Sequence, residues 1–135
     1  MVTLDPPWHP PSWSLDPSRP LYEQIARLIR IELACGRLAP GTRLPPVREF
    51  AAKLRVTPNT VMRAYLDLER DGLIETFRGQ GTFVPRDPRV VTASRRALAR
   101  EAVAYVQRIA ESMGMTVEEL IRLAKGEEEG GCTTS

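Results

Sequence analysis

Two short helical patterns separated by only a few residues are the feature that most constrains the fold. Within each pattern the apolar residues recur every three or four positions, at Val47, Phe50, Ala51 and Leu54, then at Val61, Tyr65 and Leu68. Thr57 is a suitable N-cap and Pro58 a suitable first helical residue. The second helix therefore begins within a few residues of the first one ending, which is helix-turn-helix spacing.

The flanking segments complete a small domain over 20–88. A helix starting at Pro20 carries an apolar stripe and ends near Gly36, which suits a left-handed C-terminal position. Residues 42–44 are long enough for a very short strand, and Pro46 suits the first turn of the helix over 46–54. Residues 73–77 and 82–84 predict two strands joined by a tight turn at 78–81. We predict a mainly α (α+β) fold, a winged helix-turn-helix domain with a two-stranded β-wing.

After residue 88 the pattern changes to an amphipathic helix over about 94–113. Gly114 ends it, and Thr116 with Glu119 forms a capping box for a short helix from Val117 to Ala124. A single helix cannot bury its own apolar stripe, so we predict that 89–126 is a helical dimerisation region that forms a homodimer. The predicted interface residues are Leu98, Ala102, Tyr105, Val106, Ile109 and Met113.

The two ends of the chain have different compositions. Residues 1–19 form a proline-rich N-terminal arm, and 127–135 are polar, glycine-rich and expected to be a flexible tail. Trp8, His9 and Trp13 resemble a small site, but we expect the aromatic rings to attach the arm to the folded domain.

Charge and side-chain chemistry both suggest a nucleic-acid partner. Residues 18–86 carry twelve Lys or Arg against seven Asp or Glu, although a solvated charged surface explains that excess equally well. In a helix-turn-helix protein the first turns of the second helix enter the major groove, and they need short hydrogen-bonding side chains. A glycine-containing wing tip brings an arginine close to the backbone or minor groove. The residues predicted to contact DNA on these grounds are Thr57, Asn59, Thr60, Arg63, Arg78, Gly79 and Gln80.

The stretches RPLYEQIARLIR and GRLAPGTRLPPVREFAAKLRVTPNTVMRAYLDLERDGLIETFRGQGTFV resemble the DNA-binding domain of GntR-family bacterial regulators. The short tail and the lead-in WSLDPSRPLYEQI resemble the YtrA subfamily. The resemblance implies a repressor bound to a palindromic double-stranded DNA operator, and it adds Arg48, in the LPxxRE motif, to the DNA contacts. Some relatives carry a base-reading arginine where this chain has Met62. Whether Met62 or Arg63 contacts a base is left open. Whether Arg43 contacts DNA or is only solvated is also left open.

Other classes of protein are less consistent with the sequence. One histidine and the lack of paired carboxylates or a nucleophile motif argue against an enzyme, and Cys35 and Cys132 match no metal spacing. We expect no cofactor, no membrane span and no signal peptide, hence a cytoplasmic protein. A winged-helix protein-interaction module and a non-specific architectural DNA binder are the alternatives. A small-molecule effector, where there is one, is expected between subunits.

Overall fold

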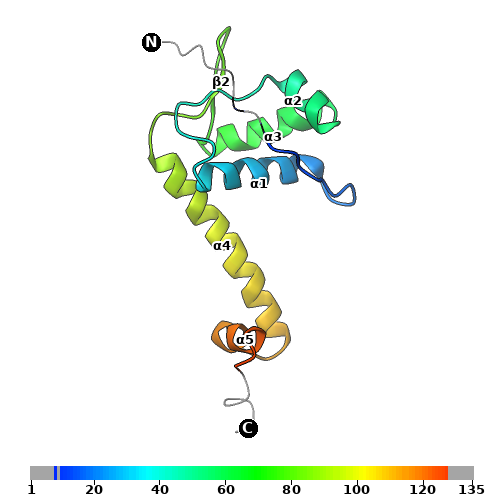
Figure 1. Cartoon of the computed structure of the whole chain (residues 1–135), viewed down its shortest axis with the longest axis vertical. Helices are drawn as coiled ribbons and strands as arrows, with labels where there is room; N and C mark the ends of the chain where they lie inside the picture. The colour runs from blue at the N-terminus through cyan, green and yellow to red at the C-terminus, as the bar shows by residue number, and fades with distance from the viewer. Residues whose placement is uncertain (1–7, 9, 128–135) are drawn as a thin grey trace. The chain divides into compact units, whose positions relative to one another are not determined.

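The computed structural model describes residue 8 and residues 10–127. Its elements, in chain order, are α1 (Leu21–Ala34), α2 (Val47–Leu54), α3 (Pro58–Arg70), β1 (Glu75–Phe77), β2 (Gly81–Phe83), α4 (Arg89–Ser112) and α5 (Val117–Ala124) (Figure 1). They form two compact units, the first ending at Arg96 and the second beginning at Ala97. The mainly α winged helix-turn-helix fold predicted from the sequence is confirmed.

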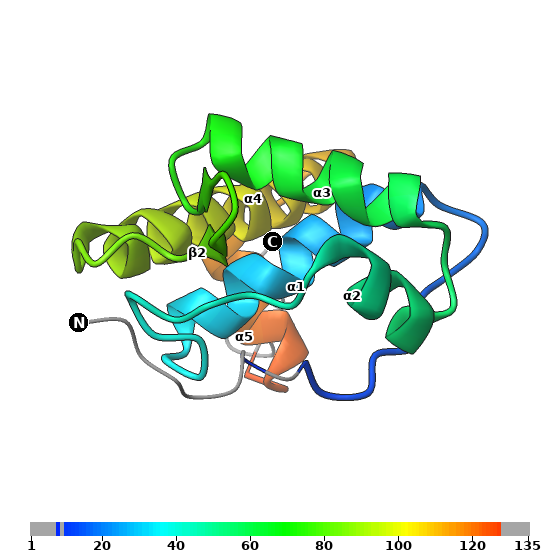
Figure 2. The ribbon, with the colours of Figure 1, turned by 90° about the horizontal axis from the view of Figure 1, so that it is seen from above.

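The first unit has one hydrophobic core, because α1 and α2 both pack against α3 (Figure 2). The predicted apolar stripes supply it. Fully buried members are Ile25, Ile29 and Leu33 from α1, Phe50 from α2, and Val61 and Leu68 from α3. Tyr65 adds a polar anchor, since its buried hydroxyl donates to the Pro45 carbonyl oxygen at 2.7 Å. Burial also raises the pKa of the Tyr65 phenol.

An ion pair that the sequence did not predict stabilises the C-terminal end of α1. Gly36 takes the predicted left-handed conformation, with φ of +88°. Just before it, the Glu32 carboxylate is buried and accepts hydrogen bonds from Arg37 Nε at 3.0 Å and Nη2 at 2.8 Å. These bonds and the Glu32 charge raise the pKa of Arg37. The buried carboxylate therefore stays paired, as a buried charge must.

The turn between α2 and α3 sets the position of the second helix. Helix α2 ends in Arg55, whose φ of 60° is left-handed, and α3 begins at Pro58 with Thr57 as its N-cap, as predicted. The Thr57 hydroxyl accepts a hydrogen bond from the Thr60 backbone N–H at 3.4 Å. The prediction for Pro46 was wrong by one position, because it is the N-cap residue of α2 and the helix begins at Val47.

The wing is a two-stranded antiparallel hairpin in which Glu75 pairs with Phe83 and Phe77 with Gly81. The first strand begins two residues later than predicted, because Leu73 and Ile74 are buried in the core. The second begins one residue earlier, at Gly81 rather than residue 82. The short strand predicted at 42–44 is reduced to a single bridge from Arg43 to Phe83.

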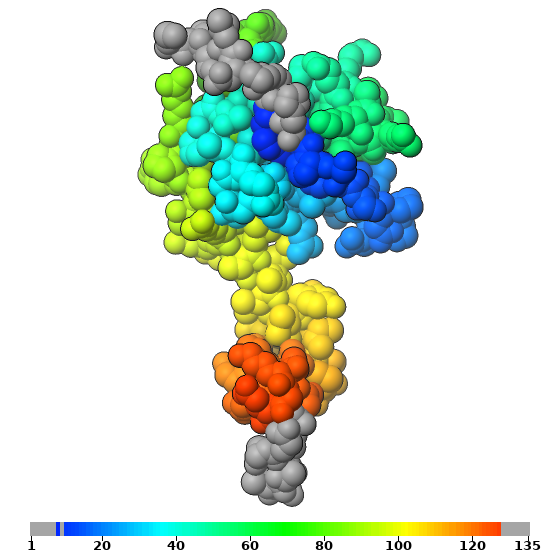
Figure 3. Space-filling model, in the orientation of Figure 1, coloured from blue at the N-terminus to red at the C-terminus, as the bar shows by residue number. Residues whose placement is uncertain are grey.

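The N-terminal arm packs on the first unit through aromatic rings. Trp8 and Trp13 lie with their ring centroids 6.2 and 5.9 Å from that of Phe50. The backbone N–H of Trp8 donates to the Arg43 carbonyl oxygen at 2.9 Å. Figure 3 shows this dark blue segment lying against the cyan and green surface of the same unit. The expected attachment of the arm is confirmed for both tryptophans, whereas His9 lies outside the described residues.

Helix α4 begins at Arg89, about five residues earlier than predicted. The Asp87 carboxylate accepts the Arg89 N–H at 2.9 Å, which satisfies a free donor at the helix start, and Val90 joins the hydrophobic core. Asp87 is itself held ionised, because hydrogen bonds from Arg89 lower its pKa. Among the described helices, none is both long and apolar enough to cross a membrane.

The second unit contains the rest of α4 and the short helix α5. Helix α5 spans the predicted residues, and its capping box is complete. The Thr116 hydroxyl accepts from the Glu119 N–H at 3.1 Å, and the Glu119 carboxylate accepts from the Thr116 N–H at 2.8 Å. The turn between the helices is closed by the Met115 N–H, which donates to the Ala110 carbonyl at 2.8 Å. The capping interactions predicted from the sequence are therefore confirmed.

Candidate nucleic-acid interface

The first turn of α3 presents small polar side chains to solvent. Thr57 and Asn59 are exposed, and Thr60 is half-buried. The two threonine hydroxyls lie 2.9 Å apart and are hydrogen-bonded to each other. Within the described part of the chain the Asn59 side chain has no hydrogen-bond partner, which leaves its amide available to a ligand. Of these three predicted DNA contacts, Asn59 is the one whose polar atoms are not already used.

Arg48 lies in the first turn of α2 and is exposed. A surface ion pair with Glu49 or another acid is the alternative role for Arg48, yet Arg48 forms no ion pair among the residues that the structure describes. A free guanidinium next to the helix-turn-helix suits phosphate, which it can bind with two hydrogen bonds.

Arg63 has an intramolecular partner that the sequence does not reveal. Its guanidinium carbon lies 3.9 Å from the centroid of the Tyr22 ring, within the range of a cation–π interaction. Tyr22 stands in the first turn of α1, 41 positions earlier in the chain, so no local pattern connects the two. The stacking restrains Arg63 but does not neutralise its charge.

The wing tip carries Arg78, Gly79 and Gln80, and all three are exposed. The Gln80 N–H donates to the Phe77 carbonyl at 2.9 Å, and Gly79 has a φ of +79°, which closes the turn in a conformation that favours glycine. The tip therefore presents Arg78 from a backbone with little side-chain bulk. As with Arg48, no ion pair holds Arg78 within the described residues.

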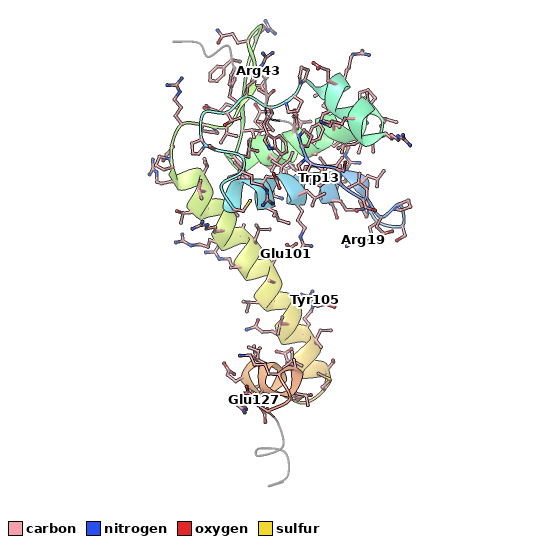
Figure 4. All side chains as sticks on the ribbon, viewed as in Figure 1. Trp13, Arg19, Arg43, Glu101, Tyr105 and Glu127 are labelled. Carbon is pink, nitrogen blue, oxygen red and sulfur yellow. The ribbon has the colours of Figure 1, made fainter. Side chains whose placement is uncertain are left out.

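Arg43 is half-buried and lies alongside the wing, where it bridges to Phe83 of β2 (Figure 4). Its Nε is buried without a hydrogen-bond partner among the described atoms, and it lies 3.0 Å from where a Cβ at Gly81 would stand. Gly81 also has a φ of +122°. A side chain at position 81 would therefore be strained and would displace the Arg43 guanidinium from beside Gly81.

Some arginines of the first unit are paired with carboxylates and others are not. Carboxylates neutralise Arg30, Arg37, Arg70 and Arg89, which bind Asp71, Glu32, Asp67 and Asp87 respectively. Arg48, Arg63 and Arg78 form no such pair in the described part of the chain. These three arginines therefore leave uncompensated positive charge on α2, α3 and the wing tip, the three segments that a winged helix uses on DNA. Arg55, Arg86 and Arg96 of the same unit are also exposed and form no ion pair among the described residues.

The predicted dimerisation residues differ in exposure. Tyr105 is 59% exposed, Met113 49% and Ile109 39%, and Figure 4 shows the Tyr105 side chain projecting from α4. Ala102 is also exposed, whereas Leu98 and Val106 are half-buried. The sequence-based list missed three further exposed apolar residues of this unit, Val103, Ile121 and Leu123.

Metal chemistry finds no support in the described residues, where no group of three or more His, Cys, Asp or Glu side chains could hold an ion. Apart from the buried Tyr65, the pKa shifts belong to caps and ion pairs, such as Asp16, whose pKa is lowered mainly by hydrogen bonds from Ser18. None of them marks a catalytic acid or base.

Comparison with known proteins agrees with this geometry. Residues 21–84 match the family model described as bacterial regulatory proteins, gntR family. The HTH-type transcriptional regulator YhcF of Bacillus subtilis is 40% identical over 84% of this chain and 94% of its own length. The transcriptional repressor YtrA of the same organism is 47% identical over 52% of this chain and 55% of its own length. A GntR-family regulator from Listeria monocytogenes superposes with a TM-score of 0.76 at 33% identity, over 83% of this chain and 98% of that one. YtrA from Sulfolobus acidocaldarius superposes with a TM-score of 0.52 at 33% identity, over 67% and 96%.

Proposed function

Because this chain belongs to the GntR family of bacterial regulatory proteins, we propose that it represses transcription by binding a palindromic operator as a homodimer. It is a transcription regulator with a winged helix-turn-helix DNA-binding domain, and its relatives are named as regulators rather than enzymes. The resemblance to the YtrA subfamily is supported by both YtrA proteins. The repressor role follows the printed name of the Bacillus relative.

One observation carries the DNA-binding part of the proposal. Arg48, Arg63 and Arg78 have no carboxylate partner among the described residues, and they lie on α2, α3 and the wing tip of the unit that exposes the Asn59 amide. By contrast, Arg30, Arg70 and Arg89 of the same unit are paired with carboxylates. Phosphate contacts position a protein on the duplex, and contacts to base edges select the sequence. We assign phosphate contacts to Arg48 and to the wing-tip residues Arg78, Gly79 and Gln80. We assign the base contact to Asn59.

The homodimer is proposed from the second unit. Tyr105 and Ile109 lie four residues apart on α4, and Met113 follows at the same spacing just after the helix ends, so the three form one exposed apolar strip. The same strip on a second chain, related by a two-fold axis, is the simplest surface to cover it. Such an axis places two α3 helices in successive major grooves about 34 Å apart, and the operator is then palindromic. An effector, where one exists, binds between the subunits, and the complex acts in the cytoplasm, where the DNA is.

Two substitutions separate positioning from sequence selection. Arg78→Ala weakens binding to operator and random DNA alike and lowers the salt dependence, whereas Asn59→Ala weakens operator binding only. Arg70→Ala is the matched control, because this exposed α3 arginine is already paired with Asp67. Fluorescence anisotropy on both DNAs measures the effects. If Asn59→Ala loses affinity equally for operator and random DNA, the assignment of Asn59 is contradicted. If the wild-type protein binds operator and random DNA with equal affinity, it is an architectural binder. If the wild-type protein is not retained on DNA at low salt, it is a protein-interaction module.

A further inference from the structure

The exposed face of α3 carries a large apolar residue directly beside the candidate base-reading amide. Met62 is 48% exposed and Leu66 54%. Asn59, Met62 and Leu66 follow at three- and four-residue spacing, so they line one strip of the helix surface. Nothing in the hydrophobic core requires a methionine here, because Val61, Ala64 and Tyr65 face the core instead.

The long cationic neighbour of Met62 is turned to a different partner. Arg63 stacks on the Tyr22 ring of α1 at 3.9 Å, so its side chain leans toward α1. The Tyr22 hydroxyl in turn donates to the Glu23 carboxylate at 3.3 Å, which orients the ring. Met62 is thus the long side chain next to Asn59 that is not tied to another element by any polar or ring contact in the described structure.

We propose that Met62 determines sequence preference by packing against the C5-methyl group of a thymine in each operator half-site. This inference rests on the proposed function and adds a contact with the base itself. The thymine methyl is the apolar group that the major groove offers, and it distinguishes thymine from cytosine. Met62 suits it, because an unbranched thioether adapts to a small apolar target. The Asn59 amide, one turn earlier, suits adenine, so the pair together favours A·T base pairs.

The size of the effect follows from the area that one methyl group removes from water. Burying one such group contributes about 0.8 kcal/mol, which is roughly a fourfold change in affinity for each half-site and about 15-fold for two. Replacing thymine by uracil deletes only this methyl and leaves every hydrogen bond of the base pair in place. The thymine-to-uracil change is therefore the most direct probe of the proposed contact.

The experiment uses the full chain and an operator selected from a random DNA pool. Each thymine of the operator is replaced in turn by uracil, symmetrically in both half-sites, and affinity is measured by anisotropy. One position should show the loss of roughly 15-fold in the wild type. Met62→Ala should bind the thymine operator with a similar loss and show no further loss with uracil, as a double-mutant cycle requires for a direct contact.

Leu66→Ala is the matched control, since it deletes a similarly exposed apolar side chain one turn further along and should keep the full uracil penalty. Met62→Arg should move the preference at that position toward guanine. Both side chains are exposed, so neither alanine variant should unfold the chain. A uracil penalty that persists in Met62→Ala, or the absence of any penalty, overturns the inference and leaves the proposed function standing. A chain that selects no sequence from the pool overturns the proposed function itself.

Discussion

Placing a charge at Ile109 is the sharpest test of the apolar strip on α4. Ile109 is 39% exposed, and fully burying an isoleucine contributes about 1.5–3 kcal/mol, so covering the exposed part contributes about 1 kcal/mol per chain. A two-fold interface uses the residue twice, which makes about 2 kcal/mol. Partial burial of the two carboxylates in Ile109→Glu costs about 1–2 kcal/mol more. We therefore expect dimerisation to weaken roughly 100- to 1,000-fold.

Sedimentation velocity over a range of concentrations measures this change, and operator binding is measured in parallel. Ile109→Glu should sediment as a monomer at concentrations where the wild type is dimeric, and operator affinity should fall because the second half-site contact is no longer intramolecular. Gln107→Glu is the control. It adds the same charge to an exposed position two residues away, about 200° around the helix, and should stay dimeric. A dimeric Ile109→Glu protein refutes the reasoning.

Truncation after Arg96 gives an independent test of the same interface. A shorter fragment that ends at Pro88 would lose the buried residues Val90 and Ser94. It would also lose the hydrogen bond that Arg95 Nε donates to the Ala34 carbonyl oxygen at 2.8 Å. The longer fragment keeps all of these and should stay folded but monomeric. A fragment that still dimerises places the interface in the first unit.

Three further outcomes are expected. Tyr65→Phe leaves the Pro45 carbonyl without its hydrogen bond and should lower the free energy of unfolding by about 1–2 kcal/mol in urea titrations, and an unchanged midpoint contradicts the role of this bond. Hydrogen bonds from Thr116 lower the pKa of Glu119 in the folded chain, so ionised Glu119 stabilises α5 above the unfolded-state pKa. This stabilisation is lost as the pH falls through the lower, folded-state pKa. Hydrogen exchange of α5 should show the loss, and Glu119→Gln should abolish the pH dependence. If about 6–10 phosphates are neutralised, operator affinity should fall about 10³–10⁵-fold between 50 and 200 mM salt, and a flat titration excludes this binding mode.

The parts of the fold that sequence predicted well are those fixed by neighbouring residues. Thr57 and Pro58 mark the start of α3, and Thr116 with Glu119 marks the start of α5, because each cap is a bond between residues three apart. The apolar stripes of α1 and α3 likewise follow directly from helical periodicity.

The differences arise where distant residues decide the outcome. Helix α4 starts early because Asp87 caps it and the core accepts Val90, which the repeat spacing further along does not signal. The stacking of Arg63 on Tyr22 joins two helices and depends on how α1 packs against α3. The sequence also does not name the bases that we propose Asn59 contacts, since base selection depends on the geometry of the bound duplex.

Selection of bound sequences from a random DNA pool tests the central claim most directly. If a homodimer presents two α3 helices related by a two-fold axis, the full-length protein should enrich one motif with two inverted half-sites whose centres lie about 10 base pairs apart or a multiple of that. Ile109→Glu, assayed beside it, should lose most of its affinity for that motif. Enrichment of a single unpaired half-site, or no enrichment over the starting pool, contradicts the account.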